Sequence, residues 1–234
     1  MMKTILISLF FSILFSFLIS NPVPPVLFSE IYFEDDEWTL ELYDYYNYFV
    51  GMTLDGCEIS SSADTVQFND GIYFNFEEVL LITSEDLQDP LAINKTGDFV
   101  KLTGIVFDDE IIFGEFPGSN VNSPFEGQSL ARVSYGNMFA GEDYYLAKEN
   151  QPSLGSNPFS VNTRGVLSGY VYDINENPVN SARIEYNPSD YLFFLYTDDT
   201  GFYENTQMLG MNYSVTVYID DTEYGSENIT VEPD

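Results

Sequence analysis

The feature that most constrains this chain is its hydrophobic periodicity. Apolar and polar residues alternate over short runs, most clearly at 165–173, 182–186 and 213–219, and no stretch from 26 to 157 keeps a helical period for three turns. Tight-turn residues separate the runs, with Asn-Glu-Asn-Pro at 175–178 and Asp-Asp-Thr-Gly at 198–201. The pattern predicts an all-β protein built from β-sandwiches, with strands of the first domain at 26–33, 37–43, 51–59, 71–76, 78–82, 99–103, 104–107 and 110–115.

The first twenty residues predict a signal peptide. Lys3 precedes an uninterrupted apolar run that ends near Ser20, and a Pro-rich segment follows at 22–25. Cleavage near Ser20 gives a secreted or cell-surface protein of bacterial type. Because Leu18 is a poor match to the small residue preferred before a cleavage site, an uncleaved N-terminal anchor stays open as the alternative. After signal removal, no run is long enough to span a membrane.

Composition indicates a folded, strongly acidic chain. The net charge is −31, so nucleic acid and anionic lipid surfaces should repel it, and we expect no nucleic-acid partner. With 44% hydrophobic residues the chain is too apolar for disorder. We predict a signal peptide at 1–20, a first domain at 24–157, a linker at 158–164 and a second domain at 165–234.

Two residue types limit the chemistry. The sequence has no His and one Cys, Cys57, so Ser-His-Asp and Cys-His nucleophile systems and the common zinc sites cannot be built. Cys57 has no partner for an intramolecular disulfide, and we expect it to be buried as a small apolar residue. We therefore expect a protein that is not an enzyme.

The second domain resembles the carboxypeptidase regulatory-like domain, a prealbumin-type sandwich. The resemblance runs from Gly165 to about Val231. It is carried by Gly165-Val-Leu-Ser-Gly-Tyr-Val-Tyr-Asp173, by Asn177-Pro-Val179 with Ala182, by Thr197-Asp-Asp-Thr-Gly-Phe-Tyr203 and by the run at 213–219. Such a resemblance implies architecture and leaves activity undefined.

The first domain, from Val26 to about Asn157, resembles the lamin-tail domain, an immunoglobulin-like sandwich. Short motifs occur in the order of that family: Phe28-Ser-Glu-Ile31, Asp36-Glu-Trp-Thr-Leu-Glu-Leu-Tyr43, Leu54-Asp-Gly56, Gly97-Asp-Phe-Val-Lys-Leu102, Ser129-Leu-Ala-Arg132 and Pro152-Ser-Leu-Gly-Ser-Asn157. The sequence departs from the family pattern by an extra residue in the second motif, by Cys57 in place of an aromatic residue and by Leu154 in place of a Pro.

Acidic turns raise the question of calcium. Asp173, Asn175 and Asn177 have the D-x-N-x-N spacing of a calcium loop, but the Gly and Glu of an EF-hand loop are missing from their positions. Asp198 and Asp199 lie in a second acidic turn. Turns in which Asp and Asn bond to their own backbone explain the same residues, so calcium is an alternative and no cofactor is required.

Two further features of the first domain admit a functional and a structural interpretation. Glu30 and Glu41 could form the carboxylate pair of a glycan hydrolase, but we expect them to fix loops or face solvent, with Glu41 on the exposed face opposite Trp38. The aromatic run at 43–49 would stack on sugars or on a partner if exposed, and would pack if buried.

The sequence thus predicts a non-catalytic secreted or cell-surface binding or structural protein, with an extracellular protein or glycan as its partner. Two alternatives stay open. The chain is an accessory fragment of an extracellular hydrolase or nuclease, since both resembled modules accompany such enzymes, or it is a calcium-stabilised adhesion module.

Overall fold

The computed structural model describes residues 26–35, 37–44, 51, 53–74, 79–104, 108–134, 144–156, 159, 161–187 and 193–234. Within these ranges the protein is all-β, with a single short 3-10 turn, η1 (Ser84–Asp86). The predicted fold class, a chain of β-sandwiches, is confirmed. The predicted signal peptide and most of the aromatic run at 43–49 lie outside the described residues.

The first sandwich pairs a five-stranded sheet with a four-stranded one, in an immunoglobulin-like, antiparallel arrangement. The five-stranded sheet has the order β5-β2-β1-β8-β9. Its strands are β5 (Val79–Ile82), β2 (Glu37–Asp44), β1 (Val26–Glu34), β8 (Ser129–Ser134) and β9 (Tyr144–Glu149). The other sheet has the order β4-β3-β6-β7 and consists of β4 (Thr65–Gln67), β3 (Glu58–Ser60), β6 (Gly97–Thr103) and β7 (Asp109–Gly114).

Apolar side chains from both sheets fill the space between them. On β2, Trp38, Leu40 and Leu42 alternate along one face and are buried, as expected for a half-buried strand. The rings of Phe33 on β1 and Phe113 on β7 lie 5.7 Å apart and join the two sheets. Burial of such side chains supplies most of the stability of a sandwich.

The second sandwich packs a two-stranded sheet against a four-stranded one. The small sheet consists of β10 (Gly165–Tyr170) and β13 (Phe202–Met208). The larger sheet has the order β12-β11-β14-β15, formed by β12 (Phe193–Tyr196), β11 (Arg183–Asn187), β14 (Asn212–Ile219) and β15 (Thr222–Thr230). Ile184, Tyr186, Tyr213 and Val215 face inward and are buried against Leu167.

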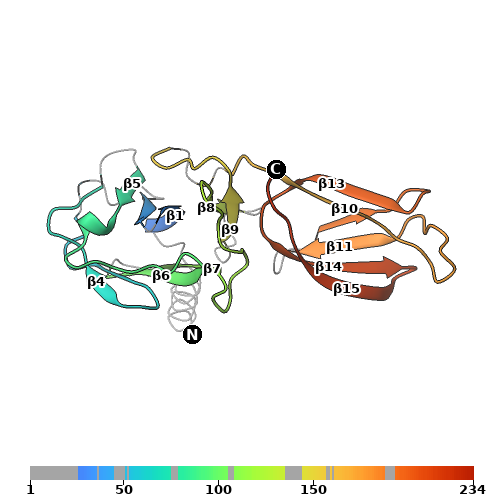
Figure 1. Cartoon of the computed structure of the whole chain (residues 1–234), viewed down its shortest axis with the longest axis horizontal. Coiled ribbons are helices and arrows are strands. Elements are labelled where there is room, and N and C mark those ends of the chain that lie inside the picture. The colour runs from blue at the N-terminus through green and yellow to red at the C-terminus, as the bar shows by residue number, and fades with distance from the viewer. Residues whose placement is uncertain are drawn as a thin grey trace, which may run out of the picture.

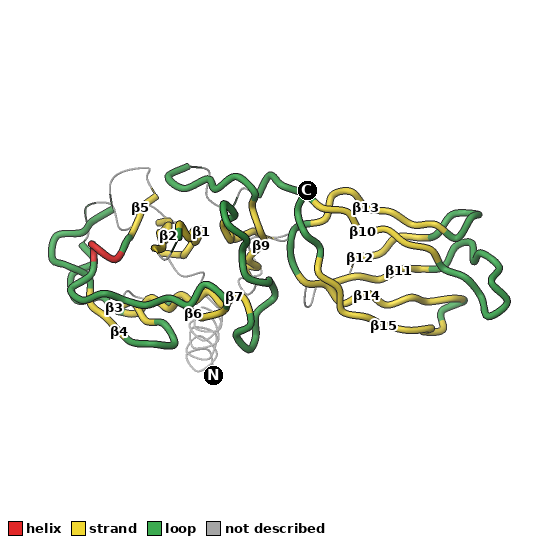
Figure 2. Tube along the Cα trace, viewed as in Figure 1, coloured by secondary structure: helices red, strands yellow, loops and turns green. Residues whose placement is uncertain are grey.

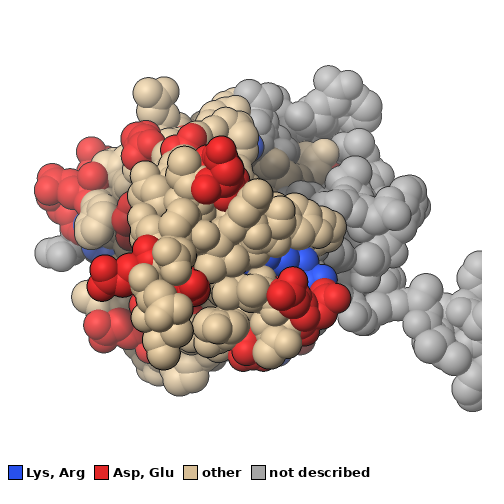
Figure 3. All heavy atoms as spheres, turned by 90° about the vertical axis from the view of Figure 1, so that its right-hand side faces the viewer, with Lys and Arg blue, Asp and Glu red and all other residues tan. Residues whose placement is uncertain are grey.

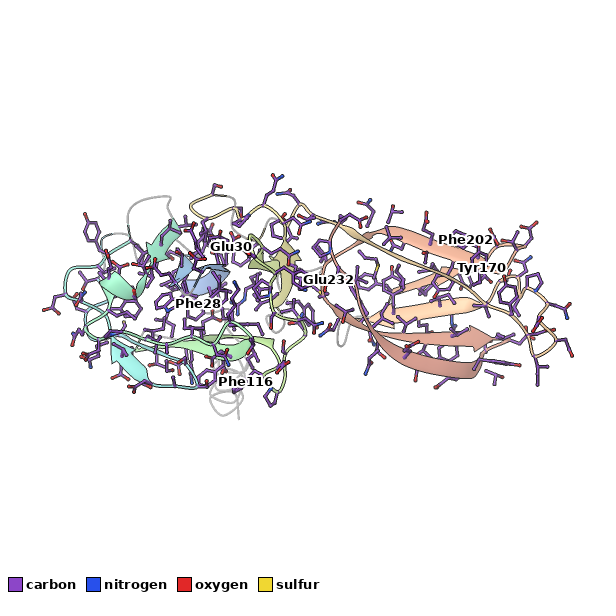
Figure 4. The ribbon with its side chains drawn as sticks, viewed as in Figure 1. Phe28, Glu30, Phe116, Tyr170, Phe202 and Glu232 are labelled. Carbon is purple, nitrogen blue, oxygen red and sulfur yellow. The ribbon has the colours of Figure 1, made fainter. Side chains whose placement is uncertain are left out.

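The two sandwiches lie end to end, and the C-terminus returns to the junction between them (Figure 1). At this junction the buried Lys148 of β9 donates from its ammonium group to both carboxylate oxygens of Glu232, at 2.7 Å. Backbone N–H groups also cross the junction, from Lys148 to the Gly210 carbonyl and from Asn212 to the Asn120 carbonyl, each at 2.9 Å. Figure 4 shows Glu232 between the sandwiches.

The end of the second sandwich away from this junction is made of loops (Figure 2). Three turns meet the strands there, at 173–177, 198–201 and 220–221. The first two are joined through Val171, whose N–H donates to the Gly201 carbonyl at 2.9 Å and whose carbonyl accepts from the Val179 N–H at 3.0 Å. We call this the distal end of the second sandwich.

Most strands predicted from alternation are present, but their bounds and number differ. A turn occupies 55–56, so only the end of the predicted strand at 51–59 belongs to β3. The described part of the predicted strand at 71–76 forms isolated bridges instead of a strand. Of the predicted strand at 104–107, all but Gly104 lies outside the described residues. Alternation missed β4, β8, β9, β12, β13 and β15.

Candidate functional site

Three exposed large apolar side chains of the second sandwich form a row on β10 and its continuation. Alternation places Tyr170 and Tyr172 on the outer face, where they are 59% and 51% exposed, and Ile174, in the turn that follows, is 93% exposed. The intervening Val171 points inward and is buried. A soluble protein seldom leaves such a group of neighbouring rings in water without a use for it.

Ring contacts hold this row together. The rings of Tyr170 and Tyr172 are stacked with their centroids 6.0 Å apart, at 14° between the planes. Phe202, opposite Tyr170 in the β10–β13 ladder, places its ring centroid 5.0 Å from that of Tyr170. Figure 4 shows Tyr170 and Phe202 near each other toward the distal end of the second sandwich. We call Tyr170, Tyr172, Ile174 and Phe202 the aromatic row.

The inner face of the same sheet is occupied next to the row by Tyr203. Gly169 directly precedes Tyr170 and faces the sandwich interior. A Cβ at this position would lie 2.6 Å from the Tyr203 hydroxyl oxygen. Tyr203 is packed against the core. Tyr203 therefore occupies the inner face beside Gly169, opposite the face that carries the row.

The first acidic turn follows the row directly. One carboxylate oxygen of Asp173 accepts hydrogen bonds from the N–H groups of Asn175 and Asn177, each at 2.8 Å, and the other accepts from the Asn177 side-chain amide at 3.0 Å. These bonds to the ionised form, led by the Asn177 side chain and N–H, lower the pKa of Asp173. The turn is thus a hydrogen-bonded Asx turn.

The second acidic turn has the same design. Asp198 accepts from the hydroxyl of Thr200 at 2.7 Å and from the N–H groups of Thr200 and Phe202 at 2.8 and 3.0 Å. The hydroxyl contributes most to a lowered pKa of Asp198. Because Phe202 begins β13, this turn also fixes one ring of the aromatic row.

Four of the five predicted calcium candidates therefore have protein partners. Asp173 and Asn177 bind each other, Asn175 donates to the same carboxylate, and Asp198 caps its own turn. Asp199 is exposed. Over the described part of the chain, no three acidic or Cys residues come together in a way that could hold a metal ion.

Acidic side chains surround the distal end. Asp198, Asp199, Asp220 and Glu176 are all exposed there, as is Asp221, whose side chain is 92% exposed. Figure 3 shows this end directly, with acidic groups scattered over a surface that is otherwise mostly uncharged and Lys or Arg groups visible at one side. Glu176 and Asp199 lie in the two turns that adjoin the aromatic row, and we call them its negative rim.

A second exposed aromatic pair provides a contrast. Phe194 and Tyr196 on β12 are 59% and 56% exposed, with ring centroids 5.9 Å apart. They occupy the outer face of the four-stranded sheet, opposite Glu185 and Arg183 of β11. Arg183 is paired there with Glu185 and stacks 4.7 Å above the Tyr218 ring. This pair thus lies beside a partnered cation.

In the first sandwich, Glu30 and Glu41 are neighbours in the β1–β2 ladder and both are buried. Glu30 accepts from the N–H of Ser153 at 3.0 Å and from its hydroxyl at 2.8 Å, and Glu41 accepts from the Gly155 N–H at 2.6 Å. The expectation that these acids fix a loop is confirmed. The expectation that Glu41 lies on an exposed face is wrong, because the loop at 153–155 covers it.

Burial is also the main influence on Glu41. Desolvation raises its pKa, against the hydrogen bonds from Ser29 and Gly155, and the nearby Glu30 raises it further. Cys57 is buried without a disulfide partner, as predicted, and burial raises the pKa of its thiol. Burial is thus the main influence on the pKa of both groups.

The sequence singled out the acidic turns and missed the aromatic row beside them. The signal was present, because Tyr170, Tyr172 and Ile174 repeat at period two around the buried Val171. Alternation alone does not tell which face is inside when both faces carry apolar residues.

No family model, curated protein or solved structure matches the chain. Among the described residues, no helix has the length and apolar character needed to cross a membrane.

Proposed function

We propose that this chain is a non-catalytic, secreted or cell-surface binding protein that contacts an extracellular protein or glycan through the aromatic row. The observation that carries the proposal is the exposure of Tyr170 and Tyr172, at 59% and 51%, in a stacked pair that the sandwich does not use for its own packing. Rings held in this way offer a large contact area at little cost in side-chain entropy.

The site is also preorganised, which favours binding. The Asp198 turn fixes Phe202 through two hydrogen bonds: the Phe202 N–H donates to the Asp198 carboxylate at 3.0 Å, and the Asp198 N–H donates to the Phe202 carbonyl at 2.9 Å. A rigid surface loses less entropy when a partner binds. The resemblances to lamin-tail and carboxypeptidase regulatory-like modules, and the predicted export, agree with a role in recognition outside the cell.

The test compares two double variants of the chain without residues 1–20. The first, Tyr170→Ser with Tyr172→Ser, removes the stacked rings of the row. The matched control, Phe194→Ser with Tyr196→Ser, removes an equally exposed pair from the other sheet. Immobilised protein should retain a partner from the envelope or medium of the source organism, and only the first variant should lose it. Equal retention by the two variants would contradict the proposal.

A further inference from the structure

We infer that the partner of the aromatic row is a protein segment rich in Lys or Arg, bound in extended form with its cationic side chains over the rings. This inference rests on the proposed function and names the chemistry of the partner. It follows from the row and its rim taken together: the rings accept a cation on their faces, and the acids around them provide the opposite charge.

The charged residues of the second sandwich are almost all acidic. From 165 to 234 the only cationic residue is Arg183, and it is already paired with Glu185 at 3.0 Å and with Asp221 at 3.5 Å. The acids of the rim at Asp199 and Glu176 have no cationic residue of this sandwich left to bind. A cationic partner supplies the missing charge, whereas an anionic partner is repelled.

The aromatic surface selects among cationic partners. A guanidinium or ammonium group over a Tyr or Phe face is stabilised by the ring, and the apolar stem of Arg or Lys packs on the neighbouring side chain. Ile174, at 93% exposure, extends the row toward the Asp173 turn and offers such a stem an apolar contact. The protein itself uses this contact at Arg183 over Tyr218.

The spacing of the row suits an extended segment. Tyr170, at the end of β10, and Tyr172, two residues on, have ring centroids 6.0 Å apart, which is close to the spacing of about 6.6 Å between every second side chain of an extended chain. An extended partner also presents every second side chain to one face at the same repeat. A neutral glycan would stack on the rings but gain nothing from the rim, and for this reason the charge favours a basic polypeptide.

The experiment measures binding of short fluorescein-labelled peptides to the chain without residues 1–20, by fluorescence anisotropy. The probes are a peptide of alternating Arg and Val, its counterpart of alternating Glu and Val, and the neutral glycans cellohexaose and chitohexaose as competitors. We expect the Arg peptide to bind at least about tenfold more tightly than the Glu peptide, with affinity that falls as salt increases.

Variants separate the row from general attraction to an acidic protein. Tyr170→Ser with Tyr172→Ser should weaken the Arg peptide at least about tenfold, since central aromatic side chains dominate interfaces. Phe194→Ser with Tyr196→Ser should leave binding unchanged. Glu176→Gln with Asp199→Asn should weaken binding and its salt dependence more than Glu85→Gln with Asp89→Asn, which removes two exposed acids from the first sandwich.

The outcomes distinguish this inference from the proposed function. The inference is overturned if the two aromatic variants bind the Arg peptide equally, or if the two charge variants do. Either result would mean that the peptide is attracted to the acidic protein as a whole and not to the aromatic row. If a glycan binds in a manner that needs Tyr170 and Tyr172 and the Arg peptide does not, the inference fails and the proposed function stands. If no probe binds and partner retention does not depend on the row, both fail.

Discussion

The ion pair at the junction between the sandwiches gives a prediction that the structure makes quantitative. Glu232→Gln removes the charge that Lys148 contacts at 2.7 Å through both carboxylate oxygens. The Lys148 side chain is 1% exposed and that of Glu232 is 41% exposed. Breaking a fully buried pair costs about 3–5 kcal/mol and an exposed pair at most about 1 kcal/mol, so we expect a loss of about 1–3 kcal/mol here.

The assay uses Trp38, the single Trp of the chain, as a probe of the first sandwich. Its ring is 6% exposed and its Nε1–H donates to the Leu91 carbonyl at 2.9 Å, so unfolding should change its fluorescence. With a urea slope of about 2 kcal/mol per molar, the midpoint should fall by about 0.5–1.5 M. Glu227→Gln, an exposed acid on β15, should not move it.

A second variant tests the reasoning itself. Lys148→Met together with Glu232→Gln removes both charges. In the wild type the Lys148 ammonium lies 4.4 Å from the centroid of the Phe125 ring, so the variant places an apolar chain against this ring. Because the cost of Glu232→Gln is that of a buried unpaired charge, the double variant should recover most of the lost stability. A midpoint for Glu232→Gln equal to the wild type, or a double variant less stable than Glu232→Gln, would refute this account of the junction.

The remaining predictions concern Glu41, the turns and calcium. Because the pKa of Glu41 is raised in the folded state, its contribution to stability is complete below the ordinary carboxyl pKa and is lost as pH rises through the folded pKa. The melting temperature of Glu41→Gln, relative to that of the wild type, should therefore increase between about pH 4 and pH 7. A difference that stays constant with pH would contradict this. Gly201→Ala should cost about 1–3 kcal/mol in denaturant unfolding, because its φ is +75° and a Cβ would lie 2.5 Å from a backbone oxygen, whereas Gly225→Ala, with open space around it, should cost nothing. Millimolar calcium should raise the melting temperature no more than magnesium does, because Asp173 and Asp198 are occupied by their own turns, and a calcium-specific rise would restore the metal site.

Alternation predicted strands that have one buried and one more exposed face, such as β6 and β14. It missed, among others, one strand that is covered on both sides and one that is exposed on both. The described side chains of β8, at 129–133, are all buried, and Arg132 reaches Asp109 of β7 with a buried ion pair at 2.9 Å, so no polar face marks the strand. β15 is exposed over nearly its whole length and shows no apolar face. Periodicity records a difference between faces, and these strands have none.

The same limit applies to the site. The turn chemistry of Asp173 and Asp198 was predictable, because Asx turns depend on residues two to four positions apart. The burial of Glu41 was not, since it depends on Gly155, which lies far along the chain and closes over it. The pairing of Tyr170 with Phe202 also depends on strand register, which local patterns do not fix.

The most direct measurement of the central claim is site-specific photo-crosslinking. The benzophenone amino acid p-benzoylphenylalanine replaces Tyr172 in one variant and Phe194 in another, two aromatic residues of similar exposure on opposite sheets. On irradiation with the partner of the source organism, the substitution at Tyr172 should give an adduct whose crosslinked peptide is rich in Lys or Arg, and the substitution at Phe194 should give none. Crosslinking from Phe194 alone, or equally from both positions, would contradict the claim that the aromatic row is the binding surface.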